Sequence, residues 1–152
     1  MILNRQRSVR VSTPELKKFL GRALRRLRLP AGALTVCLVE SRVMARWNLA
    51  YRGKKGPTDV LSFPTNGAQG RGTHARAPKR GIGSESNSYL GDIAIAPAVA
   101  RRNATRFRRT FSEEMRILIL HGILHLMGYD HEADDGQMDR REQRLRRECR
   151  LG

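Results

Sequence analysis

Residues 112–131 of this chain, SEEMRILILHGILHLMGYDH, predict the helix around which the fold is organised. From Met115 to Met127 the segment is apolar almost all round, which is typical of a helix that is covered on most sides. Ser112 is suited to cap its start. Gly128 is suited to end it in a left-handed conformation. We therefore expect a central buried helix.

Three histidines lie at the end of this segment. His121 and His125 are four residues apart, which places both imidazoles on one helical face. Beyond Gly128 the chain can turn, so that His131 approaches the same point. Three neutral imidazoles with an open fourth position are the ligand set of a catalytic zinc. We therefore predict one Zn²⁺ bound by these three side chains and a water; His74, the remaining histidine, is not expected to take part.

Ordinary core histidines are the competing interpretation. Imidazoles in an apolar helix would have few partners, and an unpaired buried polar group costs about 1–3 kcal/mol. A bound metal removes that cost; zinc is the first choice, although nickel, copper and cobalt also accept imidazole. The same histidine spacing occurs in metzincin proteases. Their general base follows the first histidine, where this chain has Gly122, so peptidase chemistry is not supported.

The remaining segments alternate between strand and helix patterns. Strands are predicted at 1–11 (an edge strand), 34–39, 60–64 and 90–96. Helices are predicted from Thr13 as N-cap to about Leu27, from Ser41 to about Tyr51, from Pro97 to about Phe107, and from Asp134 onward. This order predicts one α+β domain over 1–152, with a small three- to four-stranded sheet packed with several helices.

The charge of the chain is strongly regional. Residues 1–110 carry 23 basic and 5 acidic side chains, a net charge of +18, whereas residues 111–152 carry 7 and 9, a net charge of −2. Such a basic region favours a polyanionic partner, and nucleic acid before a membrane. Arginine outnumbers lysine 25 to 5, so genome base composition is an alternative cause of the excess.

Composition also bounds the class of protein. Apolar residues make up 39% of the chain, enough for a packed core, and no run approaches the roughly 18–20 apolar residues of a membrane span. Cys37 and Cys149 are too isolated for a disulfide framework and are expected to be reduced. We expect a soluble, cytoplasmic protein. The glycine-rich, basic segment 65–88 exceeds an ordinary loop of about 4–6 residues, which favours a mobile insertion.

Three blocks of sequence resemble the YbeY family of bacterial endoribonucleases, zinc-dependent proteins of ribosomal RNA maturation. The blocks are HGILHLMGYDH at 121–131, NLAYRGK at 48–54 followed by PTDVLSFP at 57–64, and LGDIAI at 90–95. The resemblance implies that His121, His125 and His131 hold the metal and that Arg52 is needed for activity. It implies a single-strand-specific endoribonuclease of rRNA processing, with the ribosomal small subunit or its assembly factors as partners.

Some positions stay open. Without the resemblance, Arg52 would be interpreted as a solvated surface arginine. Asp59 suits either a hydrogen-bond acceptor for a metal-ligating imidazole or a turn, and Asp130 is equally ambiguous. The 65–88 segment is longer and more basic than the family's connection, and Ala96 replaces its helix-capping residue. The alternatives are a metallopeptidase-like hydrolase and a non-catalytic RNA- or ribosome-binding factor with a zinc site.

Overall fold

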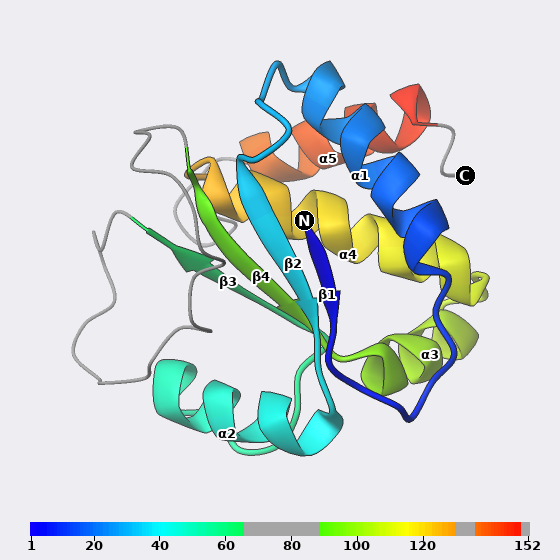
Figure 1. The fold of residues 1–152 in the computed structure, drawn as a ribbon, viewed down its shortest axis with the longest axis vertical. Helices are drawn as coiled ribbons and strands as arrows, with labels where there is room; N and C mark the ends of the chain where they lie inside the picture. The colour runs from blue at the N-terminus through cyan, green and yellow to red at the C-terminus, as the bar shows by residue number, and fades with distance from the viewer. Residues whose placement is uncertain (66–88, 130–135, 150–152) are drawn as a thin grey trace.

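The computed structural model describes residues 1–65, 89–129 and 136–149, and has the predicted α+β architecture around a four-stranded sheet (Figure 1). Its strands are β1 (Ile2–Asn4), β2 (Leu34–Leu38), β3 (Val60–Pro64) and β4 (Gly91–Ile95). Its helices are α1 (Thr13–Arg26), α2 (Ser41–Arg52), α3 (Pro97–Arg106), α4 (Phe111–Leu126) and α5 (Gln137–Glu148). The predicted fold class is confirmed.

The sheet has the strand order β1-β2-β4-β3. Strands β1, β2 and β4 are parallel, whereas β3 runs antiparallel to β4 along the opposite edge. Strand β1 is an edge strand as predicted, but it covers only Ile2–Asn4, because the Gln6 side chain binds the backbone of Val9 and begins a turn. Successive residues of each strand point to opposite faces, so both faces of the sheet are available for packing.

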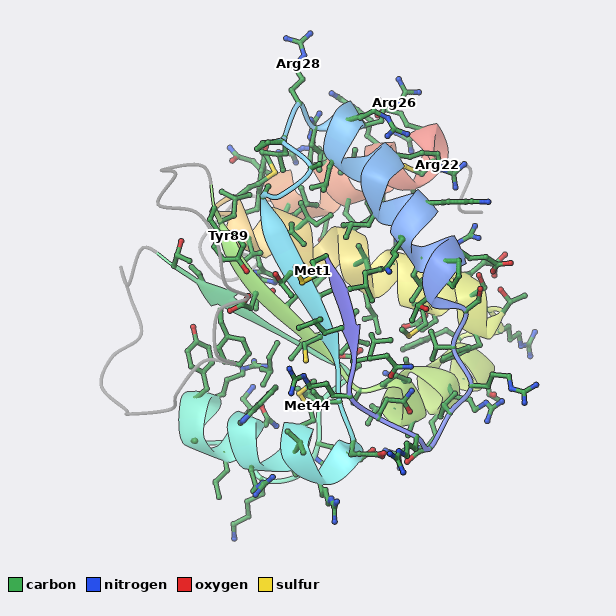
Figure 2. All side chains as sticks on the ribbon, viewed as in Figure 1. Met1, Arg22, Arg26, Arg28, Met44 and Tyr89 are labelled. Carbon is green, nitrogen blue, oxygen red and sulfur yellow. The ribbon has the colours of Figure 1, made fainter. Side chains whose placement is uncertain are left out.

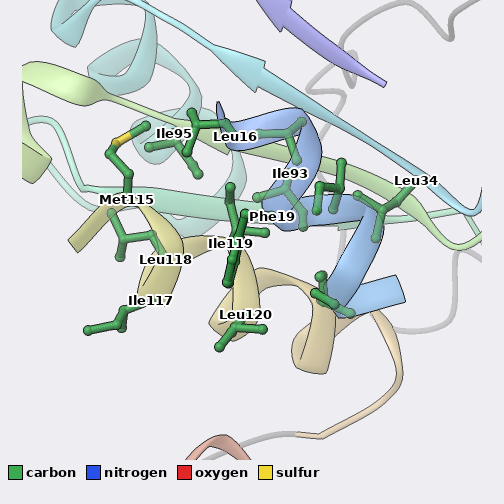
Figure 3. Packing of buried hydrophobic residues seen from close by; sticks show 14 of the residues in the cluster. Leu16, Phe19, Leu34, Ile93, Ile95, Met115, Ile117, Leu118, Ile119 and Leu120 are labelled. Atoms are coloured by element: carbon green, nitrogen blue, oxygen red, sulfur yellow. The ribbon is translucent and has the colours of Figure 1, made fainter. Parts of the chain in front are cut away.

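The two faces carry apolar clusters of different size. On one face α4 lies against the sheet, with α1 and α5 packed beside it (Figure 1). Figure 3 shows side chains of α1 and α4 packed against those of β2 and β4. This larger cluster includes Phe19, Leu34, Leu38, Ile93, Ile95, Met115, Ile119, Leu120, Ile123 and Leu124, all fully buried. On the other face α2 packs on a smaller cluster formed by Cys37, Val39, Met44, Leu61, Phe63, Ala94, Ala96 and Val99. The predicted burial of the central helix is confirmed.

The starts of the helices differ slightly from those predicted. Helix α4 is capped by Thr110, and Ser112 lies inside its first turn. Thr110 Oγ1 accepts a hydrogen bond from Glu113 N at 3.1 Å, while the Glu113 carboxylate accepts one from Thr110 N at 3.0 Å. This reciprocal capping box satisfies two backbone donors, which a cap at Ser112 would not. Similarly, Thr13 and Ser41 are first helical residues rather than N-caps.

Two predicted features fall partly outside the described residues. Of the 65–88 segment only Thr65 is described; its hydroxyl donates to Tyr89 O at 2.8 Å and its backbone N–H to Leu90 O at 3.0 Å. The proposed start of the last helix at Asp134 also lies outside, and the described helix begins at Gln137.

Both cysteines are free thiols. Among the described helices, none has the length and apolar character needed to cross a bilayer.

Candidate functional site

The site begins where α4 presses most closely on the sheet. A Cβ atom on Gly122 would lie only 2.8 Å from the side chain of Ile93 in β4, so this point of contact has room for glycine alone. Ser62 of β3 donates a hydrogen bond from Oγ to Gly122 O at 3.3 Å. Gly122 therefore allows α4 to pack closely on the sheet. The same contact sets the distance between the sheet and the helical turn that carries the two histidines.

His121 and His125 face each other across one turn of α4. Their Nε2 atoms are 3.0 Å apart, and their rings lie 4.6 Å apart between centroids at an interplanar angle of 69°. Both side chains are half-buried. The two imidazoles thus lie on one face of the helix, as predicted. Their Nε2 atoms point toward each other and do not occupy separate positions in the core.

A buried carboxylate supports the outer nitrogen of His121. Glu142 of α5 lies with Oε2 3.0 Å from His121 Nδ1, and its other oxygen is bound by the guanidinium of Arg146, one turn further along α5. Burial by itself would raise the pKa of the Glu142 carboxyl, but the hydrogen bond from His121 and the charge of Arg146 outweigh it and lower that pKa. Glu142 is therefore held as an anion beneath His121.

This donor set fits a zinc ion. In a tetrahedral site, Zn–N bonds of about 2.0–2.1 Å place two ligand nitrogens roughly 3.4 Å apart, so a separation of 3.0 Å needs only a small ring movement. Metal-ligating histidines almost always donate their second ring N–H to a carboxylate, carbonyl or water, as His121 is placed to do. Over the described ranges no third ligand joins the pair. His131, the predicted third ligand, lies outside them, as do His74 and Asp130.

Arg52 lies at the last position of α2, exposed to solvent. Gly53 ends the helix with a left-handed backbone, φ 67°, which a glycine adopts at little cost. The turn that follows is anchored by Asn48, whose amide donates to Gly56 O at 2.8 Å. Within the described structure the Arg52 guanidinium makes no ion pair or hydrogen bond, so it is available to an incoming anion.

Strand β3 connects the two parts of the site. Ser62 points toward α4 and binds the backbone of Gly122, while its neighbour Phe63 points toward α2. The ring of Phe63 packs edge-on against Tyr51 at 4.9 Å and against Trp47 at 6.0 Å. Arg52 and the histidines thus come from opposite faces of the sheet and do not touch, but two adjacent residues of one edge strand hold both helices.

Asp59 and Glu142 have partners that lie far away in the sequence. The Asp59 carboxylate accepts a hydrogen bond from Asn103 Nδ2 at 3.1 Å, which ties the start of β3 to α3 and favours the turn role over the imidazole role. Glu142 was not predicted at all, although a signal was present. It occupies the same helical stripe as Met138 and Leu145, where an acid must find a buried partner.

Comparisons with known proteins all indicate one family. A family model described as Endoribonuclease YbeY matches residues 1–150. Among curated proteins of that name, one from Koribacter versatilis is 36% identical over 151 residues, covering 99% of this chain and 86% of the relative. Others from Frankia casuarinae and Thermobifida fusca are 38% and 41% identical over 110 and 106 residues.

The matched length differs among these relatives. The alignments cover 72% and 70% of this chain but only 52% of the Frankia casuarinae protein and 63% of the Thermobifida fusca protein, so this chain matches about half to two thirds of their length. Among solved structures, the solution structure of TM1509 from Thermotoga maritima is similar, with a TM-score of 0.57 and 27% identity. That match covers 98% of this chain and 89% of the other, which extends the likeness to the whole fold.

Proposed function

This chain belongs to the YbeY endoribonuclease family, and we propose that it is a zinc-dependent endoribonuclease that cuts single-stranded RNA during ribosomal RNA maturation. The observation that carries the proposal is the pair of Nε2 atoms 3.0 Å apart on His121 and His125, with a carboxylate behind the first ring. Two ring nitrogens at this separation, turned toward one point, have nearly the spacing of two ligands of one tetrahedral zinc ion.

In this proposal His121, His125 and His131 would hold one zinc ion and leave a fourth position open to water. When bound at such a site, zinc supplies Lewis acidity toward water and toward phosphoryl oxygens. The protein's own part is to present the imidazoles in fixed orientation. The burial of α4 on the larger cluster and the close contact of Gly122 with Ile93 support that role.

Arg52 is proposed to bind the phosphate that is cut. A guanidinium stays charged at any physiological pH and donates through a planar fork that matches two phosphate oxygens. In this position it would stabilise the negative charge that builds up on those oxygens during cleavage. Gly53 and the anchored turn after it hold the end of α2 from which Arg52 projects.

The wider surface supports binding through phosphates rather than through bases. Arg22, Arg26 and Arg28 project around the end of α1, as Figure 2 shows, and other arginines are exposed along α2 and α3. Among the aromatic rings, Phe19 and Phe63 are buried, and only Tyr51 and Phe107 are large exposed ones in the described structure. We therefore propose strongly salt-dependent binding with weak sequence preference.

The setting of this reaction follows from the same proposal. A chain that processes ribosomal RNA would act in the cytoplasm and meet its substrate on the ribosomal small subunit or its assembly factors.

The two competing functions are less well supported. A metzincin-like peptidase needs a glutamate where Gly122 stands, and any side chain there would meet Ile93. A non-catalytic factor would be expected to close its zinc site with a fourth protein ligand.

The test uses zinc-quantified protein with labelled single-stranded RNA, duplex RNA and casein, each with and without a chelator. His125→Ala should lose both zinc and RNA cleavage. Arg52→Ala should keep zinc and lose roughly 10²–10³-fold in cleavage rate. Arg46→Ala, which removes another exposed arginine of the same helix, is the matched control; it can weaken RNA binding but should cleave at the normal rate when RNA is saturating.

Each result separates the candidate functions. Cleavage of single strands that needs zinc and both residues supports the proposed nuclease. Cleavage of casein instead would indicate the peptidase. Tight RNA binding without any cleavage would indicate the non-catalytic factor, and RNA cleavage that survives in both variants would come from a contaminating nuclease.

A further inference from the structure

Glu142 is a buried acid of α5, a helix that supplies no other residue to the proposed site. We propose that Glu142 is a positioning residue, whose carboxylate holds His121 in the ring orientation and tautomer that present the Nε2 lone pair toward His125. The inference deepens the proposed function and rests on it, since its premise is a metal at the His121–His125 pair. It concerns a residue of α5, outside the histidine motif itself.

The contacts of Glu142 are specific. Glu142 is 5% exposed. One of its carboxylate oxygens lies 3.0 Å from His121 Nδ1, and the other accepts a hydrogen bond from Arg146. It is flanked along α5 by Met138 and Leu145, which are buried in the larger cluster. A carboxylate in such surroundings is costly unless both oxygens are paired, and here both are.

These contacts determine where the proton of a neutral His121 lies. An ionised carboxylate can only accept hydrogen bonds, so at 3.0 Å it selects the tautomer with the proton on Nδ1. In that tautomer His121 Nε2 carries the lone pair and faces His125 Nε2 at 3.0 Å, which is the orientation that a metal at this pair would need. Metal ligands must offer a lone pair, so Glu142 prepares one ligand before the metal arrives.

A simpler role is a salt bridge that stabilises α5 alone. Glu142 and Arg146 are four residues apart, a spacing at which ion pairs support a helix. That role would affect folding but would leave the proton of His121 and the affinity for zinc unchanged. The two roles are therefore separable by measurements that do not depend on RNA cleavage.

The first measurement needs no mutation. In the metal-free protein at a pH well above the ordinary imidazole pKa of about 6.5, the ¹⁵N chemical shifts of His121 report which ring nitrogen is protonated. We expect the Nδ1–H tautomer to predominate. A predominantly Nε2–H imidazole would overturn the proposal, whatever the protein does to RNA.

The second measurement is zinc affinity by competition with a chromophoric chelator. Glu142→Met keeps side-chain length in an apolar environment, so α5 should still pack, and thermal unfolding checks that it does. We expect zinc binding to weaken roughly 10–100-fold and the Nδ1–H tautomer to lose its predominance. Glu148→Met removes an exposed acid of the same helix and should leave both unchanged.

The outcomes distinguish this inference from the proposed function. If His125→Ala loses zinc while a folded Glu142→Met binds it as tightly as the unmodified protein, the metal site stands and the positioning role is wrong. If His125→Ala also keeps full zinc affinity, the metal site itself is wrong. The positioning role is supported if a folded Glu142→Met protein binds zinc more weakly and has an altered His121 tautomer, while Glu148→Met shows neither change.

Discussion

On one face of the sheet, α4 and its histidines rest on the larger apolar cluster, with α1 and α5 packed around them. On the other face, α2 and Arg52 rest on the smaller cluster, in which Met44 lies between the helix and the sheet (Figure 2). Of the residues of α2, only Met44 and Asn48 are buried. The difference suggests that the proposed metal ligands are positioned by the core, whereas the proposed phosphate ligand is positioned by a few local bonds.

The two faces of the sheet should respond differently to mutation. Interiors are packed as tightly as organic crystals, so a change beneath α4 cannot be absorbed without a loss of stability. A change at the end of α2 faces solvent and can be accommodated by local movement. Perturbing the first face should therefore lower the free energy of unfolding, while perturbing the second should lower activity more than stability.

The largest effect is expected from Gly122→Ala. The added Cβ would lie 2.8 Å from Ile93, and overpacking of this kind costs about 1–3 kcal/mol of unfolding free energy. Urea denaturation measures the loss. Gly21→Ala in α1 is the matched control, because its Cβ would meet only the Arg25 side chain at 3.5 Å. That change should instead stabilise the protein by about 0.5–1 kcal/mol, as alanine favours helix.

A double variant tests the cause of the loss. In an Ile93→Ala background the clash is removed, so adding Gly122→Ala should cost nothing or stabilise the protein. If the two changes were additive, the contact between α4 and β4 would not be the reason for glycine at this position.

The next effect is expected from Asn48→Ala, on the opposite face. It removes the hydrogen bond to Gly56 O, which should cost about 0.5–1.5 kcal/mol, while the turn after Arg52 loses its anchor. If Arg52 binds the cleaved phosphate, cleavage should fall roughly 10–100-fold through its misplacement. Urea denaturation and a single-turnover cleavage assay measure the two quantities.

Gln6→Ala is the matched control for this variant. Gln6 is also a buried amide, and its Nε2 donates to Val9 O at 2.9 Å in the connection between β1 and α1. Because the Gln6 side chain also accepts a hydrogen bond from Val9 N, this change should cost at least as much stability as Asn48→Ala and leave cleavage unchanged. Equal losses of cleavage in both variants would show that activity follows global stability, and the contrast between the two faces would then be wrong.

The same contrast explains how far the sequence could be interpreted. The α4 segment was predictable because apolar periodicity and histidine spacing are local patterns, and they survive in the folded helix as the paired rings of His121 and His125. Glu142 and Ser62 were not, because each acts on a residue 21 or 60 positions away. The close approach of Gly122 to Ile93 was hidden for the same reason. From the sequence, Gly122 showed only that the glutamate of the metzincin motif is absent.

The smallest expected effect concerns the start of α2. Glu40 accepts a hydrogen bond from Arg7 N at 2.7 Å and another from the hydroxyl of Ser8, and these bonds lower the pKa of its carboxyl. Because the folded pKa lies below the unfolded one, the bonds stabilise the protein above the unfolded pKa. That contribution is lost as the pH falls through the folded pKa.

We therefore expect Glu40→Gln to lower the Tm slightly at neutral pH and to have no effect once the carboxyl is protonated in both states. Differential scanning calorimetry from neutral to acidic pH measures this. In a Ser8→Ala background the neutral-pH effect should shrink, because Ser8 makes the larger contribution to the lowered pKa. A Tm difference that persisted at acidic pH would mean that Glu40 acts through packing, and that α2 is held at its start more firmly than the smaller cluster implies.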